Sequence, residues 1–186
     1  NALREKNNLV LALSCYQRVL EIKPNHVEAL SNIGNIFRTK GQLDKAIDNY
    51  KKAIKINPQY FEAHYNLGNT LGEKGEIGKA TACYKEATRI KPDYIEAYNN
   101  MGNMLLDAGK IERALDCFKR AIKIKPDHFE AYNNMGNAFL NAEKIKNAIN
   151  CYKESIKINP GFAQAHFNLG LVLSQTGELE AAVNSY

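Results

Sequence analysis

Proline recurs in this chain with a fixed spacing, and this constrains the fold more than any other feature. The five prolines are Pro24, Pro58, Pro92, Pro126 and Pro160, and each lies 34 residues after the one before it. A period between about 20 and 50 residues indicates a solenoid built from stacked supersecondary units. With proline at position 32 of each unit, the chain divides into a partial repeat, four full repeats and a second partial repeat: 1–26, 27–60, 61–94, 95–128, 129–162 and 163–186.

Within each unit the apolar residues have helical spacing. Ala63, Leu67 and Leu71 at positions 3, 7 and 11 form one stripe, and a second stripe follows at positions 17 to 28. Each unit is therefore predicted to hold two amphipathic helices, A and B. Glycine at position 15 (Gly41, Gly75, Gly109 and Gly177) is predicted to end helix A with a positive φ, and the proline ends helix B.

Four further positions predict how helix A is capped and how the helices pack. Asn25, Asp93 and Asp127 at position 33, each followed three residues later by glutamate, predict a capped start for helix A. Glycine at position 8 and alanine at position 20 predict close approach of the two helices, with the aromatic residue at position 24 filling the space between units. In the fourth full unit Glu143 replaces the position 15 glycine, so this turn either holds a left-handed glutamate or lets helix A run on.

These residues resemble the tetratricopeptide repeat. The resemblance rests on leucine or methionine at position 7, glycine at 8, alanine at 20 and 27, an aromatic residue at 24 and proline at 32, as in NMGNMLLDAGKIERALDCFKRAIKIKP. It covers the whole chain and implies an all-α, right-handed α-solenoid superhelix of helix-turn-helix repeats, whose A helices line a concave groove. The unit AYNNMGN is also similar to the superhelical region of O-linked N-acetylglucosamine transferases.

Asparagine is unusually frequent on the A helices. It fills position 6 in five helices and position 9 in four, three residues apart and hence on one helix face, although asparagine is a mediocre helix former. An amide offers an acceptor and two donors, which match a peptide backbone. The candidate peptide-binding residues are these asparagines with three variable residues at position 5: Asn32, Asn35, Asn66, Asn69, Asn100, Asn103, Asn134, Asn137, Asn168, Tyr65, Asn99 and Asn133. The alternative is that the position 6 amides bond to the next repeat and stabilise the stack.

The sequence favours a protein-interaction scaffold that binds an extended peptide in the groove. Two alternatives stay open: the substrate-recruiting arm of a larger enzyme such as a glycosyltransferase, and a structural repeat that self-associates end to end. No nucleophile and base stand at motif spacing, so any catalysis is expected outside this segment. Because the chain starts and stops within a unit, we expect it to be a fragment or to pack its ends on neighbours.

Charge, cysteine and hydropathy patterns exclude several other classes. The formal net charge is only +5, the basic residues late in the B helices suit the helix dipole, and nucleic-acid binding is not expected. The sequence holds no apolar run long enough to insert in a membrane. The four cysteines share position 23, too far apart for a disulfide or a metal, which favours a reducing, cytoplasmic location. We expect no metal and no cofactor.

Overall fold

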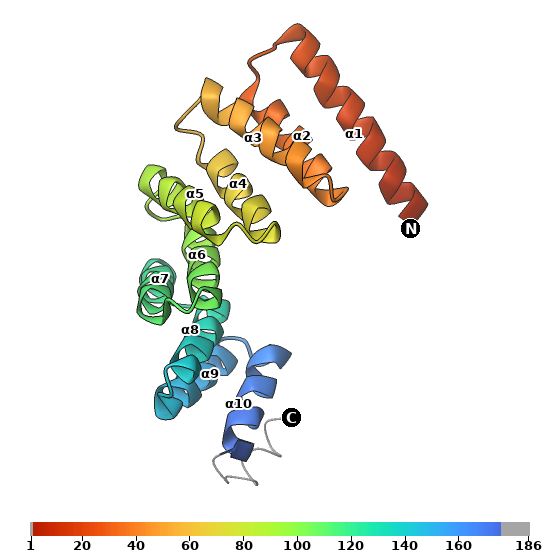
Figure 1. Cartoon of the computed structure of the whole chain (residues 1–186). Coiled ribbons are helices and arrows are strands. Elements are labelled where there is room, and N and C mark those ends of the chain that lie inside the picture. The colour runs from red at the N-terminus through yellow and green to blue at the C-terminus, as the bar shows by residue number, and fades with distance from the viewer. Residues whose placement is uncertain (1, 176–186) are drawn as a thin grey trace. The chain divides into compact units, whose positions relative to one another are not determined.

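The structure is a computed structural model that describes residues 2–175, with side chains from residue 8 onward. The described residues form ten α-helices and no strand, which confirms the all-α class (Figure 1). The helices are α1 (Ala2–Ile22), α2 (Val27–Thr39), α3 (Leu43–Ile56), α4 (Phe61–Glu73), α5 (Ile77–Ile90), α6 (Ile95–Asp107), α7 (Ile111–Ile124), α8 (Phe129–Asn141), α9 (Ile145–Ile158) and α10 (Ala163–Gln175).

The helix boundaries repeat with the period of the prolines. The A helices α2, α4, α6 and α8 all begin at position 1 of their units, and the B helices α3, α5, α7 and α9 all begin at position 17. The first partial unit differs, because α1 runs as one helix through the positions where the other units turn. Its position 15 is Asn7 rather than glycine.

The turn from helix A to helix B uses a left-handed residue, as the sequence predicts. Gly41, Gly75 and Gly109 have φ of 70°, 76° and 69°, while Gly177 lies outside the described residues. Glu143 takes the same conformation with a φ of 58°, so the left-handed alternative is the correct one for this turn. Its amide donates to Leu140 O and the next amide to Phe139 O, both at 2.9 Å, which reproduces the bonds made around Gly41.

Replacing Glu143 with glycine is expected to stabilise the chain by about 1 kcal/mol, because glycine adopts a positive φ without the steric cost that a Cβ brings. The reverse change, Gly109→Glu, is expected to cost about the same. The measurement is the midpoint of urea unfolding for both variants. Equal midpoints for Glu143→Gly and the parent chain would contradict the expectation.

The capping of helix A differs from the sequence prediction. The N-cap of α2 is His26 and that of α8 is His128, each one residue after the predicted Asn25 and Asp127. In both, imidazole Nδ1 accepts from the amide three residues on, Ala29 N at 3.3 Å and Ala131 N at 3.1 Å. The histidine is the capping residue because it is the last non-helical residue. The side chain at that position lies beside the free amides of the first turn.

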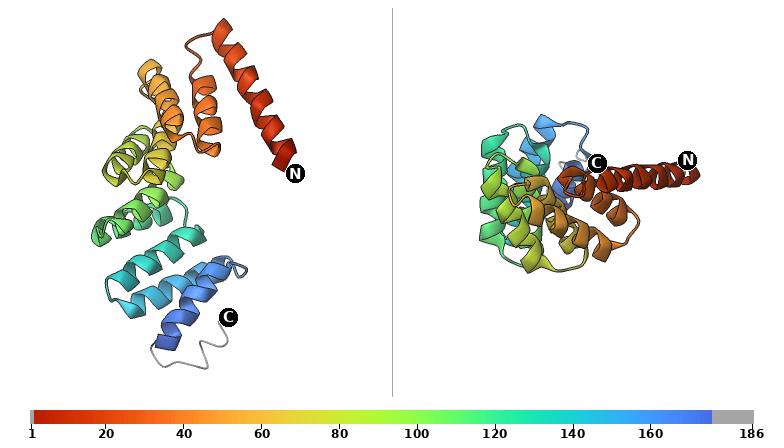
Figure 2. Two further views of the ribbon diagram at one scale, coloured as in Figure 1. Left: turned by 45° about the vertical axis from the view of Figure 1, so that its right-hand side comes forward. Right: turned by 90° about the horizontal axis from the view of Figure 1, so that it is seen from above.

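Contacts divide the chain into two compact units, one ending at Tyr94 and one beginning at Ile95. In each unit every A helix packs on the B helix that follows it, and that B helix packs on the next A helix of the unit. Figure 2 shows the paired helices of each unit from two further directions. Apolar clusters fill these contacts: Val27, Leu30, Ala53 and Ala63 in the first unit, and Ala148, Tyr152, Leu169, Val172 and Leu173 in the second.

The aromatic residue at position 24 packs inside its own repeat, and in the fourth full repeat it also packs against the next one. Tyr50, Tyr84, Phe118 and Tyr152 are between 0 and 2% exposed, and each ring lies against the position 8 glycine of its own repeat. Tyr152 also packs against Leu169, Val172 and Leu173 of the next repeat, as predicted for a residue that fills the space between units. A Cβ on Gly34, Gly68, Gly102 or Gly136 would come within 2.5 to 2.8 Å of the ring. The prediction that position 8 requires glycine for steric reasons is confirmed, because the aromatic ring leaves no room for a Cβ.

Candidate functional site

We define the amide face as the asparagines at positions 6 and 9 of the A helices. It comprises Asn32 and Asn35 on α2, Asn66 and Asn69 on α4, Asn100 and Asn103 on α6, Asn134 and Asn137 on α8, and Asn168 on α10. All nine residues are half-buried. The helical spacing of three residues places the two asparagines of each helix on the same side.

The position 9 asparagines are hydrogen-bonded to the buried tyrosines. Tyr50 Oη donates to Asn35 Oδ1 at 2.7 Å, and the tyrosines of the second and fourth full repeats make the same bond at 2.8 Å, Tyr84 to Asn69 and Tyr152 to Asn137. Burial raises the pKa of Tyr50 and Tyr152 from 10.0 to about 12, so both hydroxyls keep their protons at neutral pH. The repeated bond fixes the amide with its oxygen inward. Sequence reasoning missed it, although the two residue types recur 15 positions apart.

The third full repeat departs from this arrangement. Its position 24 residue is Phe118, which is fully buried against Gly102 but carries no hydroxyl. Asn103 therefore lacks the inward donor that orients the other position 9 amides, and its side chain is free to present either its oxygen or its NH₂ group.

The position 6 asparagines of α8 and α10 bond to the preceding repeat. Asn134 Nδ2 donates to Asn99 Oδ1 at 3.0 Å, and Asn168 Nδ2 donates to Asn133 Oδ1 at 3.0 Å and to Asn137 Oδ1 at 3.2 Å. These bonds join adjacent repeats as the stacking alternative predicts, but they run to the preceding repeat rather than to the next one. Asn168 Oδ1 also accepts from Gln164 Nε2 at 2.9 Å, so both ends of this amide are engaged within the stack.

The candidate residues at position 5 lie in unlike environments. Asn133 is only 3% exposed, and Asn99 and Asn133 act as the acceptors of the inter-repeat bonds. Tyr65 packs edge-on against Tyr94, with ring centroids 4.9 Å apart. Phe167, at the same position on α10, is 53% exposed. Position 5 therefore contributes an asparagine that bonds to the next repeat in two repeats, and an exposed aromatic ring on α10.

The cysteines are free thiols in unlike settings. Cys15 is exposed, whereas Cys117 and Cys151 are buried. Burial raises the pKa of the Cys83 and Cys151 thiols from 9.0 to about 11, which disfavours the reactive thiolate. Across residues 2–175, no group of three or more histidine, cysteine or acidic side chains lies close enough to hold a metal ion. In the same residues, no helix is long and apolar enough to cross a bilayer.

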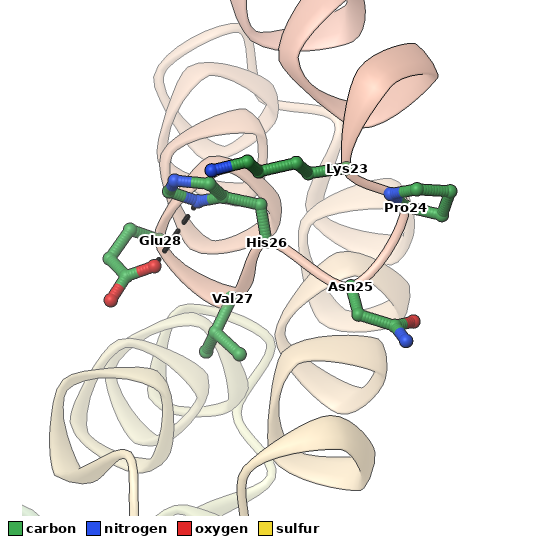
Figure 3. Close-up of a pocket in the computed structure, with 6 residues that line it drawn as sticks. All are labelled: Lys23, Pro24, Asn25, His26, Val27 and Glu28. Atoms are coloured by element: carbon green, nitrogen blue, oxygen red, sulfur yellow. Dashed lines mark ion pairs between the residues drawn. The ribbon is translucent and has the colours of Figure 1, made fainter.

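A wide hollow of about 480 Å³ lies at the turn between α1 and α2 (Figure 3). Residues 23–28 line it, and the figure shows the His26 ring beside Glu28. His26 Nδ1 lies 3.1 Å from Glu28 Oε2 and also caps α2. Nδ1 accepts from Ala29 N only when it carries no proton and donates to the carboxylate only when it carries one, so the two contacts are alternatives. The hollow is therefore lined by residues that already terminate and start helices.

A second hollow, of about 200 Å³, lies between α3, α4 and α5. Four of its charged side chains form two pairs: Lys74 Nζ lies 2.5 Å from Asp44 Oδ1, and Lys79 Nζ lies 2.5 Å from Glu76 Oε2. These pairs hold the pKa of Glu76 below its usual value and that of Lys74 above its own. These four charges offset one another, and the remaining charged residues of the lining, Asp48 and Lys51, are of opposite sign.

The chain belongs to the tetratricopeptide repeat family. A family model described as TPR repeat matches residues 34–75, 68–107, 102–143 and 136–177, and one described as tetratricopeptide repeat matches residues 15–48. These models describe repeats rather than a catalytic domain. A comparison with curated proteins finds no match.

Solved structures with this fold include those of other repeat proteins. A crystal structure of MamA is 31% identical, covering 82% of this chain and 90% of that one with a TM-score of 0.76. YrrB, described as a TPR protein with an unusual peptide-binding site, is 20% identical with a TM-score of 0.74, covering 91% and 88%. PilF of Pseudomonas aeruginosa is 21% identical with a TM-score of 0.78, covering 86% and 73%. The chain thus shares the helical repeat fold of these proteins.

Proposed function

We propose that this chain is a protein-interaction scaffold that binds an extended peptide along the amide face of its A helices. The similarity to a peptide-binding repeat protein supports the class of partner. The amide chemistry supports the mode of binding, because primary amides match the hydrogen-bonding groups of a peptide backbone. Asparagine is a weak helix former, so helix stability does not explain its recurrence on this face.

The observation that carries the proposal is the NH₂ group of two position 9 amides, those of Asn35 and Asn137. The oxygens of Asn35 and Asn137 accept from tyrosine hydroxyls. Within residues 8–175, the Nδ2 atoms of these two side chains make no hydrogen bond to the protein. Because the tyrosine bonds already hold these two NH₂ groups in place, donating to an acceptor on a guest would cost little side-chain entropy.

The hydrogen bonds between repeats indicate different roles for positions 6 and 9 of the amide face. Asn168 is engaged at both ends and serves the stack, while Asn134 has one N–H directed to Asn99 and a second available. Binding to a guest therefore falls mainly to position 9, with position 6 holding the repeats in register. With about 1 kcal/mol per bond, offset by ordering of the guest, the affinity is expected to be on the order of micromolar.

The test is a selection of random twelve-residue peptides displayed on phage, followed by calorimetric titration of the selected peptides. The variant Asn35→Ala/Asn103→Ala/Asn137→Ala is expected to lower their affinity at least about tenfold, since each lost bond is worth about 1 kcal/mol. The matched control is Asn147→Ala/Asn150→Ala, two exposed asparagines on the B helix α9, which should change nothing. Unaltered affinity in a folded triple variant would refute the proposal.

A further inference from the structure

We infer that the peptide which binds the amide face is basic, and that its lysine or arginine side chains pair with carboxylates on the same face of the A helices. The inference rests on the proposed function and adds the charge of the guest. It applies to each compact unit separately, and the second unit, which begins at Ile95, holds the residues used to test it.

Acidic and basic residues are divided unequally between the two kinds of helix. The A helices α2, α4, α6, α8 and α10 together carry six acidic residues and one basic residue. The B helices α3, α5, α7 and α9 carry six acidic and fourteen basic residues. The one basic residue of the A helices is Arg38, whose Nε lies 3.6 Å from Glu73 Oε1. The A helices are therefore net acidic in a chain that is net basic.

The acidic residues of the A helices occupy positions 2 and 13, which share a face with the asparagines. Positions 2, 6, 9 and 13 are spaced by four, three and four residues, so they form one stripe along the helix. On α10 the position 2 residue reaches position 6, because Gln164 Nε2 donates to Asn168 Oδ1 at 2.9 Å. In the second unit this stripe carries Glu96 and Asp107 on α6 and Glu130 on α8.

The helix dipole explains only part of this pattern. Glu96 and Glu130 lie in the first turns of α6 and α8, where a negative charge is favourable. Asp107 is the last residue of α6, where the negative end of the dipole disfavours a carboxylate. Its side chain is exposed, and it forms no ion pair within residues 8–175. A cation from outside the chain would offset this cost.

The spacing of the carboxylates suits a polypeptide that carries several cations. Among the described residues, no group of three or more acidic, histidine or cysteine side chains could hold a metal ion. Because α6 and α8 are in contact, Glu96 and Glu130 are about 8 to 10 Å apart. Positions 9 and 13 are about 6 Å apart along the helix axis, as are positions 2 and 6. A backbone carbonyl that accepts from Asn137 Nδ2 thus has carboxylates on both sides, within the span of lysine and arginine side chains.

The basic residues of the B helices act on the guest only weakly. Lys119 and Lys123 of α7 are exposed, while Phe118 of the same helix is fully buried against Gly102 of α6. The two lysines therefore lie on a side of α7 other than the one that packs on α6. At about 0.1 M ionic strength the Debye length is about 10 Å, close to the separation of two packed helices, so their repulsion is largely screened.

The experiment is calorimetric titration of the wild-type chain, at about 0.1 M ionic strength, with the peptides (Gly-Ser-Lys)₄ and (Gly-Ser-Gln)₄. Both have the same length, and lysine recurs every three residues, which is about 10 Å in an extended chain and matches the spacing of neighbouring A helices. (Gly-Ser-Lys)₄ is expected to bind saturably and at least about tenfold tighter than (Gly-Ser-Gln)₄, through several exposed ion pairs. Absence of (Gly-Ser-Lys)₄ binding, or equal affinity for both peptides, overturns the inference.

The variant Glu96→Gln/Asp107→Asn/Glu130→Gln tests the role of the carboxylates. It removes three negative charges from the stripe and keeps the shape of each side chain. Affinity for (Gly-Ser-Lys)₄ is expected to fall about tenfold, because three exposed ion pairs are lost. Unaltered affinity in a folded triple variant overturns the inference.

The matched control is Glu112→Gln/Asp116→Asn/Glu154→Gln, which makes the same three changes on the B helices α7 and α9. It alters the net charge of the chain by the same amount, and the affinity for (Gly-Ser-Lys)₄ is expected to stay within about twofold, because these charges lie outside the stripe. An equal loss in both variants overturns the inference, since net charge rather than the amide face would then be the cause.

The outcomes separate this inference from the proposed function. If circular dichroism shows that the triple variant is unfolded at the assay temperature, Asp107→Asn alone is used, with an expected loss of about twofold. If (Gly-Ser-Lys)₄ fails to bind while library-selected peptides still bind through the asparagines, the charge assigned to the guest is wrong and the peptide-binding scaffold stands. If the asparagine-to-alanine variant keeps its affinity for library-selected peptides, the proposed function itself fails.

Discussion

Gly136→Ala is expected to destabilise the chain by about 2 kcal/mol. A Cβ on Gly136 would lie 2.5 Å from Cε1 and 2.8 Å from Cδ1 of Tyr152. The ring cannot swing aside, because it is fully buried and its hydroxyl is bonded to Asn137. Overpacking of this kind costs about 1 to 3 kcal/mol, with the upper end expected at so short a contact, and helix propensity offsets about 1 kcal/mol.

The matched control for this substitution is Gly78→Ala. Gly78 is the second residue of α5, and a Cβ there would meet no atom within 4 Å. The same chemical change should therefore stabilise the chain, by up to about 1 kcal/mol, because only the helix propensity changes. Urea unfolding followed by circular dichroism measures both variants. If Gly136→Ala raises the midpoint as Gly78→Ala does, the glycine is not required by the ring.

Tyr152→Ala is expected to cost about 3 to 5 kcal/mol, the range for truncating a buried aromatic side chain. The ring fills the space between Gly136 and the cluster that contains Ala148, Leu169 and Leu173, and its loss leaves a cavity between α8, α9 and α10. Asn137 would also lose its buried donor. This is the largest loss of stability we expect from one substitution in the second unit.

Tyr152→Phe separates the ring from the hydroxyl. It should cost only about 1 kcal/mol, the net value of one hydrogen bond, because phenylalanine already fills this position in the third full repeat at Phe118. Urea midpoints for both Tyr152 variants give the comparison. A phenylalanine variant as unstable as the alanine variant would mean that the hydroxyl, rather than ring packing, holds the repeat together.

The helices could be predicted from the sequence because local residues determine them. Proline and glycine act through their own backbone dihedrals, so Pro58 or Gly75 marks a boundary whatever surrounds it. The sequence places the capping residue of α2 and α8 one position too early, because aspartate and asparagine have a higher capping propensity than histidine. In the structure His26 and His128 are the capping residues. Residue propensity identifies the candidate capping residues. The position at which the backbone first takes helical dihedral angles determines which of them caps the helix.

The amide face could be predicted only in part. The spacing of Asn134 and Asn137 places both on one side of α8, and the structure agrees. The hydrogen bonds could not be predicted, because they depend on residues far along the chain: Tyr152 lies 15 residues after Asn137, and Asn99 lies 35 residues before Asn134. Which end of an amide faces outward is set by such distant partners, and periodicity carries no information about it.

Each buried tyrosine lies in the same repeat as the glycine it packs on and the asparagine it bonds to, and this affects how such a chain can evolve. Gly136, Asn137 and Tyr152 all lie within residues 129–162, so copying one 34-residue segment in tandem copies a complete packing set with its oriented amide. A gene of this kind can lengthen by unequal crossover without a matching change elsewhere. Point mutations such as the one that distinguishes Phe118 from Tyr152 can then diversify the copies singly.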